Sequence, residues 1–163
     1  MNIPASEVEQ GVEQTDASTS IPSNDLLDCL LLVAHLEGKT TSRASVSSGL
    51  PLEDGKLPVM MFNRAASRAG LASTMLSREL DEIPVEVLPA ILILKNGDAV
   101  VLTDINHEQK IAIVVNPSTH LPSQVDYEQL TEECAGHVFY LRPMQHVHPK
   151  FIRKAMNTGF GVL

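Results

Sequence analysis

Two cysteines and six histidines are the side chains through which this chain could do nucleophilic chemistry. A thiolate nucleophile needs an imidazole within hydrogen-bond reach and some exposure to solvent. Cys29 lies inside the apolar run from Leu26 to Ala34, and Cys134 lies in different surroundings, without a Cys-x-x-Cys spacing. The apolar run therefore favours a buried, structural Cys29, and the spacing argues against a redox pair or a zinc site.

No histidine is tied to Cys29 by its position in the sequence. His35 lies six residues further along the same predicted helix and on a different face, so it cannot serve as the base. His107, His120 and His137 lie downstream, where the fold and not the spacing decides how near they come. A cysteine peptidase that pairs Cys29 with His107 therefore stays open as an alternative.

Metal and cofactor chemistry have little support. His146 and His148 are two potential ligands without a third at a defined spacing. Asp25 and Asp28 share one face of a predicted helix near its N-terminus, where carboxylates interact favourably with the helix dipole without any catalytic role. The sequence lacks the motifs of phosphate-binding loops, zinc peptidases and serine hydrolases. We expect neither a metal nor a cofactor.

Composition limits the class of protein. The chain has 163 residues, enough for one domain with a real core, and its formal net charge of −8 disfavours nucleic acid as a partner. Half of that charge lies in residues 1–23, which hold no basic residue and no aromatic one. We expect this segment to be a disordered acidic tail. Two cysteines without pairing signals, and no secretory signal, indicate a reducing cytoplasm.

The elements that follow the tail predict an α+β fold, with helices packed on one face of an antiparallel sheet. Asn24 or Ser23 can cap a first helix that runs to about Leu36 and ends at Gly38. Further helices are expected over residues 43–48, where Ser42 is the cap, and over residues 56–69. Strands are expected over residues 71–77, 90–94, 99–105, 111–115 and 137–141, and a short helix or turn over residues 126–132.

The run from Leu88 to Pro117 is the most informative of these segments. Asn96-Gly97 between two apolar β-branched runs is a strong hairpin signal, because both turn residues need positive φ. The strand Ile111–Val115 is apolar at every position, which is typical of a strand covered on both faces.

The order of these segments resembles the bacteriocin-processing double-glycine cysteine peptidases, the papain-like domains at the N-termini of certain ABC exporters. The resemblance covers residues 24–144. It rests on DLLDCLLLVAHLEGKTTS, LPLEDGKLPVMMFNRAASRAGLAS, LPAILILKNGDAVVLTDI, IAIVVNP and HVFYL. The implied fold is papain-like.

The resemblance also implies where a catalytic triad would lie. The family's nucleophile position falls on Asp25, its general-base histidine on Ala99, and its orienting aspartate on Asn116 before Pro117. The oxyanion-hole glutamine falls near Thr19. A carboxylate cannot act as a thiolate and a methyl group cannot take a proton, so we expect a degenerate peptidase that cleaves nothing.

An inactive branch of this family is the peptidase-like domain of type I secretion ABC transporters, which export RTX toxins and repeat adhesins, and this chain looks most like it. The resemblance implies binding of the unfolded secreted protein at the cytoplasmic face of the bacterial inner membrane. The expected contact residues are Asp25, Ile93, Ala99 and Asn116. The other partners would be the transmembrane and ATP-hydrolysing domains of the same transporter.

Residues 145–163 are expected to be a basic linker toward a membrane domain, because they hold three basic residues and no acidic one. An ordinary solvated tail explains this composition equally well. Two alternatives to substrate binding remain. One is the active peptidase that uses Cys29 to cut double-glycine leaders, and the other is a regulatory or oligomerisation module unrelated to export.

Overall fold

The computed structural model describes residue 21 and residues 24–144. The predicted acidic tail, apart from Ile21, and the predicted basic linker over residues 145–163 lie outside this part of the chain, as do Ser23 and Thr19. The elements in chain order are α2 (Leu26–Leu36), α3 (Arg43–Ser47), η1 (Val59–Met61), α4 (Phe62–Arg68), β1 (Leu71–Ser77), η2 (Leu80–Glu82), η3 (Val85–Val87), β2 (Ala90–Leu94), β3 (Ala99–Asn106), β4 (Ile111–Val115), β5 (Pro122–Asp126), α5 (Tyr127–Glu133) and β6 (Cys134–Pro143).

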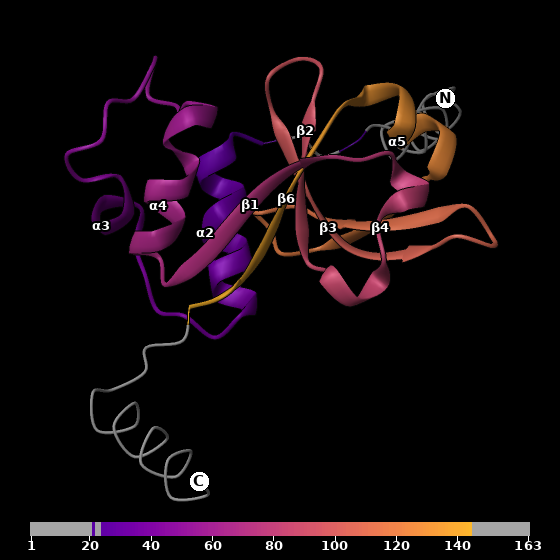
Figure 1. Ribbon diagram of the computed structural model, residues 1–163, viewed down its shortest axis with the longest axis horizontal. Coiled ribbons are helices and arrows are strands. Elements are labelled where there is room, and N and C mark those ends of the chain that lie inside the picture. Colours follow the sequence, from indigo (N-terminus) through magenta and orange to yellow (C-terminus); the bar gives the residue numbers. More distant parts are fainter. Residues whose placement is uncertain (1–20, 22–23, 145–163) are drawn as a thin grey trace, which may run out of the picture.

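The six strands form one antiparallel sheet in the order β1-β6-β2-β3-β4-β5. The last strand in the chain, β6, therefore lies between β1 and β2. Helices α2 and α4 cover one face of the sheet, and α5 lies toward the other end of the molecule (Figure 1). The predicted α+β class, with helices on an antiparallel sheet, is confirmed.

The sheet separates two hydrophobic clusters. One lies between the sheet and the helices α2, α3 and α4, and includes the stacked rings of Phe62 and Phe139, whose centroids are 4.0 Å apart. The other lies on the opposite face, under η2 and α5, and includes Leu80 and Leu130. Helix α2 is buried at most of its positions, as its nearly continuous apolar sequence predicts.

Several element boundaries differ from the prediction. The cap of α2 is Asp25, not Asn24 or Ser23, because the backbone of Asn24 is used in a β-bridge with Ala99. The third helix begins at Phe62 after a short 3₁₀ turn, because Pro58 holds an extended conformation before it.

The sheet also differs in detail. β5 was not predicted, since Pro122 and the polar residues after it carry no strand signal. β6 begins earlier than predicted, at Cys134.

In β4 only Ala112 and Val114 are buried, and the alternate residues are partly exposed, so the expectation that both faces are covered is wrong. β4 is covered on one face, as is usual in antiparallel sheets.

Candidate functional site

The start of α2 is attached to the start of β3. The Asn24 N–H donates to the Ala99 carbonyl at 2.9 Å, and the Ala99 N–H donates to the Asn24 carbonyl at 2.7 Å. Ile93 lies opposite Ala99 in the ladder between β2 and β3. Asp25, Ile93 and Ala99, which are far apart in the sequence, are therefore neighbours in the fold.

The Asp25 side chain is held by two groups. One carboxylate oxygen, Oδ1, accepts from the Asp28 N–H at 2.9 Å and so caps the helix. The other, Oδ2, accepts from Arg43 Nη2 at 3.2 Å, and the Asp25 side chain is only 11% exposed. Arg43 also donates to Asp28 and, at 3.4 Å, to the Gly55 carbonyl. The guanidinium thus joins the N-terminus of α2 to the turn over residues 53–56.

The two carboxyl groups have pKa values shifted in opposite directions. Burial favours the neutral form of Asp25 and so raises its pKa. Hydrogen bonds from Asp28 and Arg43, together with the positive charge of Arg43, have the larger combined effect and lower the pKa of Asp25. Burial and the nearby Asp25 raise the pKa of Asp28, and Arg43 opposes this. Asp25 is therefore a carboxylate at neutral pH, engaged on both oxygens.

Ala99 offers only a methyl group, and it is 1% exposed within the cluster under α2. A third ion pair, after those of Arg43 with Asp25 and Asp28, lies between Lys56 Nζ and Asp98 Oδ1 at 3.5 Å. Arg43 and Lys56 are thus two cations near the site that sequence reasoning missed. No local signal marks them, since each pairs with an acid far away in the sequence.

Asn116 directly follows β4, and Val115 of that strand lies opposite Val101 of β3. The amide oxygen of Asn116 accepts from the Ser118 N–H at 2.8 Å, and its backbone bonds to His120 and Leu121. The side chain therefore builds the turn between β4 and β5. The fold brings Asn116 to the same end of the sheet as Ala99, but its amide oxygen is occupied.

Cys29 is fully buried in the helix-side cluster. Burial raises the pKa of its thiol, and the charges of Asp25, Asp28 and Asp98 raise it further. Such a thiol stays protonated, whereas a nucleophile must ionise.

The described histidines contact other groups. His35 packs against His120, with ring centroids 5.2 Å apart. His107 Nε2 lies 2.8 Å from the Ile83 carbonyl, and its Nδ1 lies 3.4 Å from the Tyr127 hydroxyl. His137 Nδ1 lies 3.3 Å from the Ser77 hydroxyl. Within residues 24–144, none forms a hydrogen bond with Cys29.

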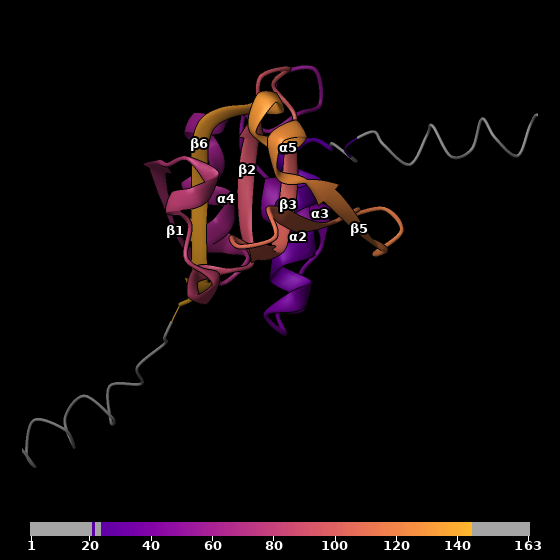
Figure 2. The same ribbon diagram turned by 90° about the vertical axis from the view of Figure 1, so that its right-hand side faces the viewer.

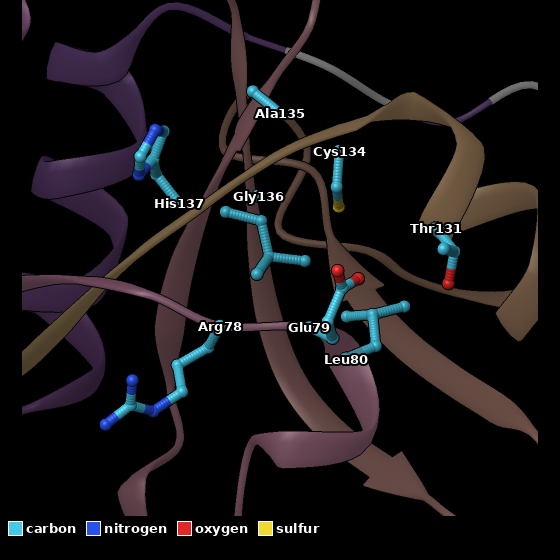
Figure 3. Close-up of a pocket in the computed structure, with 9 residues that line it drawn as sticks. Arg78, Glu79, Leu80, Thr131, Cys134, Ala135, Gly136 and His137 are labelled. Atoms are coloured by element: carbon cyan, nitrogen blue, oxygen red, sulfur yellow. The ribbon is translucent and has the colours of Figure 1, made fainter.

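A cavity of about 250 Å³ lies elsewhere, where β6 begins (Figure 3). Its lining includes Cys134, Glu79 and Thr131, and Figure 3 shows the Cys134 sulfur pointing toward Glu79. Burial, with Glu133 and Glu79 nearby, raises the pKa of Cys134 to about 12. This cavity is not lined by any of the four predicted contact residues.

Two further findings concern the described residues as a whole. They contain no group of three His, Cys, Asp or Glu side chains arranged to hold a metal ion, and His146 and His148 lie outside them. No helix among them is long and apolar enough to cross a membrane.

Comparisons with known proteins identify the fold and the family. No model of a known family matches the chain, and no curated protein matches it. Among solved structures, the N-terminal peptidase C39-like domain of the toxin secretion ATP-binding protein from Vibrio parahaemolyticus is 37% identical, with a TM-score of 0.70. The match covers 77% of this chain and 98% of that domain.

Two more distant structures share the fold. The peptidase domain of Streptococcus ComA, a bi-functional ABC transporter involved in quorum sensing, is 18% identical with a TM-score of 0.59, and the match covers 76% of this chain and 97% of that one. A double glycine motif protease from an AMS/PCAT transporter, solved in complex with a leader peptide, is 19% identical with a TM-score of 0.56. The match covers 77% of this chain and 94% of that one. These two structures support the fold, and the 37% identity to the Vibrio domain shows that this chain belongs to the peptidase C39-like domains.

Proposed function

We propose that this domain is catalytically inactive and that it binds the unfolded export substrate of an ABC transporter at the cytoplasmic face of the bacterial inner membrane. The observation that carries the proposal is the state of Asp25. It occupies the nucleophile position implied by the resemblance, and both of its oxygens are engaged, by the Asp28 N–H and by Arg43.

The chemistry of the other two positions supports inactivity. Peptide cleavage by this family's route needs a thiolate and an imidazole to exchange a proton. Ala99 has no group that can take one. Asn116 could only orient an imidazole, and its amide oxygen already accepts from Ser118. Loss of the nucleophile and the base together removes the covalent step itself.

The alternative nucleophile, Cys29, is disfavoured by its surroundings. Its side chain is fully buried, and its thiol lies among three carboxylates that oppose ionisation. A peptide bond could reach that sulfur only if α2 moved off the sheet. The active-peptidase alternative therefore requires a rearrangement of the core.

Binding without cleavage is the function that these observations support best. The Vibrio relative is a domain of a toxin secretion ATP-binding protein, and the AMS/PCAT protease was solved with a bound leader peptide. We propose an RTX-type toxin or repeat adhesin as the substrate of this chain. The surface around Asp25, Ile93, Ala99 and Asn116 is one proposed contact surface. None of these four residues is exposed, so this surface offers only part of the area that an extended polypeptide needs.

The first experiment tests cleavage. We expect the chain to leave a double-glycine leader peptide intact during an overnight incubation followed by mass spectrometry, while an active double-glycine peptidase domain cleaves it. Cleavage by this chain that disappears in Cys29→Ala would overturn the inactive assignment.

The second experiment tests binding. The ¹⁵N-labelled chain is titrated with the calcium-free, unfolded repeat region of an RTX protein encoded beside its gene, and amide shifts are followed. We expect shifts with the unfolded form and none with the calcium-folded form, because RTX repeats fold on binding Ca²⁺. No shifts with the unfolded form at high micromolar concentration would refute substrate binding.

A further inference from the structure

The two edges of the sheet differ in how well they are protected. Soluble proteins protect edge strands with prolines, charges, bulges or short length, because free backbone groups invite another strand. β5 begins with Pro122 and ends with Asp126. β1, with the sequence LASTMLS, is longer and contains neither a proline nor a charged residue. β1 is therefore the open edge.

The backbone of β1 is available to a further strand. It pairs with β6 from Leu71 to Ser77 without a bulge, so it is a regular template. In an antiparallel pair, alternate residues direct their N–H and C=O groups away from the partner. Among the described residues, only β6 pairs with β1. Figure 2 shows β1 at the border of the sheet beside β6.

A hollow lies on each side of this edge strand. On the helix side, a hollow of about 470 Å³ is lined by Val59, Met60, Asn63, Met75 and Phe139. Met60 is 79% exposed and Met75 is 47% exposed, which is unusual for such large apolar side chains. An added strand would place every second side chain on this face, where the methionines can adapt to its shape.

The opposite face has a hollow of about 560 Å³, lined by Glu37, Thr74, Leu76, Glu86, Val87, Leu88, Tyr140, Leu141, Arg142 and Pro143. Its surface is mixed, with apolar side chains between charged ones. The other set of alternate side chains of an added strand would point here.

The charge around β1 selects the kind of partner. Residues 55–78 contain Lys56, Arg64, Arg68 and Arg78 and no acidic residue, in a chain whose net charge is −8. Arg64, on α4, and Arg78, directly after β1, are exposed. Arg64 and Arg78 can attract carboxylates to the helix side of β1, whereas the opposite hollow carries Glu37 and Glu86 beside Arg142.

We infer that the free edge of β1 binds an extended, acidic polypeptide as a seventh strand, with aliphatic side chains in the methionine-lined hollow and carboxylates near Arg64 and Arg78. Main-chain hydrogen bonds would supply affinity and the hollows would select side chains, as in other cases of strand addition. This inference rests on the proposed function, for which it names a second contact surface and the charge of the bound segment.

The test uses a synthetic, end-capped peptide of about ten residues, the length of a long strand, in which Val and Asp alternate on one face of the strand and Thr fills the other face. A control peptide carries Lys in place of every Asp. Both are titrated into the ¹⁵N-labelled chain at low salt. We expect the acidic peptide to shift β1 amides and to slow hydrogen exchange of the outward N–H groups of β1. The basic peptide should bind about tenfold more weakly or worse.

The variants are matched in charge. Met75→Glu places a carboxylate at the mouth of the hollow, and Gln124→Glu adds the same charge to the other edge strand, β5. Both residues are exposed, so both variants should fold. Ala72→Glu, exposed on the other face of β1, places the same charge beside this edge if Met75→Glu does not fold. We expect about a tenfold loss of acidic-peptide affinity in the β1 variants and little change in Gln124→Glu.

The outcomes separate the two proposals. If the unfolded RTX region binds equally well to wild type and Met75→Glu, or if the peptide shifts map to Asp25 and Ile93 instead of β1, the edge inference is wrong and substrate binding stands. If neither the peptide nor the unfolded RTX region binds the wild-type chain, both proposals fail.

Discussion

Asp25 has two roles that substitution can separate. It caps α2 through Oδ1 and forms an ion pair with Arg43 through Oδ2. Asp25→Ser keeps a capping oxygen and removes the charge, whereas Asp25→Ala removes both. Arg43→Gln removes only the cation. The three variants therefore divide the contribution of one side chain into a cap and a charge.

The magnitudes follow from the geometry. Loss of a capping side chain costs about 0.5–2 kcal/mol. The ion pair is partly exposed, since the Arg43 side chain is 45% accessible, so it contributes about 0.2–1 kcal/mol. The favourable contact with the helix dipole adds about 0.3–1 kcal/mol. We expect Asp25→Ala to lose about 2 kcal/mol of unfolding free energy and Asp25→Ser about half of that or less.

Urea denaturation followed by circular dichroism measures these differences. With an m value of about 2 kcal/mol/M, a loss of about 2 kcal/mol lowers the midpoint by about 1 M. The double variant Asp25→Ser/Arg43→Gln should be more stable than the sum of the single losses predicts, because the ion pair is counted twice in that sum.

The pH dependence has a definite sign. The pKa of Asp25 is lower in the folded state, so its charge stabilises the fold above its unfolded pKa of about 3.9. This contribution is lost as the pH falls from the unfolded pKa through the lower pKa that Asp25 has in the folded state. The advantage of wild type over Asp25→Ser should therefore shrink below about pH 4. Equal stability of Asp25→Ala and wild type at pH 7 would refute the assignment of Asp25 as a structural cap.

Three further predictions concern other parts of the fold. Iodoacetamide should label Cys29 only after unfolding, as mass spectrometry of quenched samples would report; rapid native labelling would revive its role as a nucleophile. Phe62→Ala should lose about 3–5 kcal/mol of unfolding free energy, because the ring is fully buried against Phe139, and Phe62→Leu should lose clearly less. Gly97→Ala should lose about 1 kcal/mol or more, because Gly97 has a φ of 92°; an unchanged urea midpoint would contradict this.

Local chemistry made most of the fold predictable. The hairpin at Asn96-Gly97 forms as expected, but the expectation of positive φ at both turn residues is wrong, because only Gly97 has it. The Asn96 side chain instead accepts from the Asp98 N–H at 2.9 Å within the turn. The cap of α3 at Ser42 was also found, with a capping box completed by Ser45. Such signals involve residues that are close in the sequence, so the same local contacts form in the folded protein.

What could not be predicted depends on distant partners. β5 is a strand because it pairs with β4, and its own residues have little strand preference. At the site, Asp25 and Ala99 were located through the family resemblance, and the fold does place them side by side. Arg43 was missed because its ion pair with Asp25 joins residues 18 apart in the sequence. No periodicity or motif reports such a contact.

The position of β6 has a consequence for synthesis on the ribosome. β1 and β2 are separated by the strand made last, so neither can complete its pairing until Pro143 has emerged. The interval from Leu94 to Pro143 spans 49 residues, the difference of their numbers, and takes about 2–10 s to translate at ordinary rates. During that time the nascent chain exposes apolar strands with unpaired sides. We expect a nascent chain arrested before β6 to need a chaperone to avoid aggregation, and one arrested well beyond it to need none.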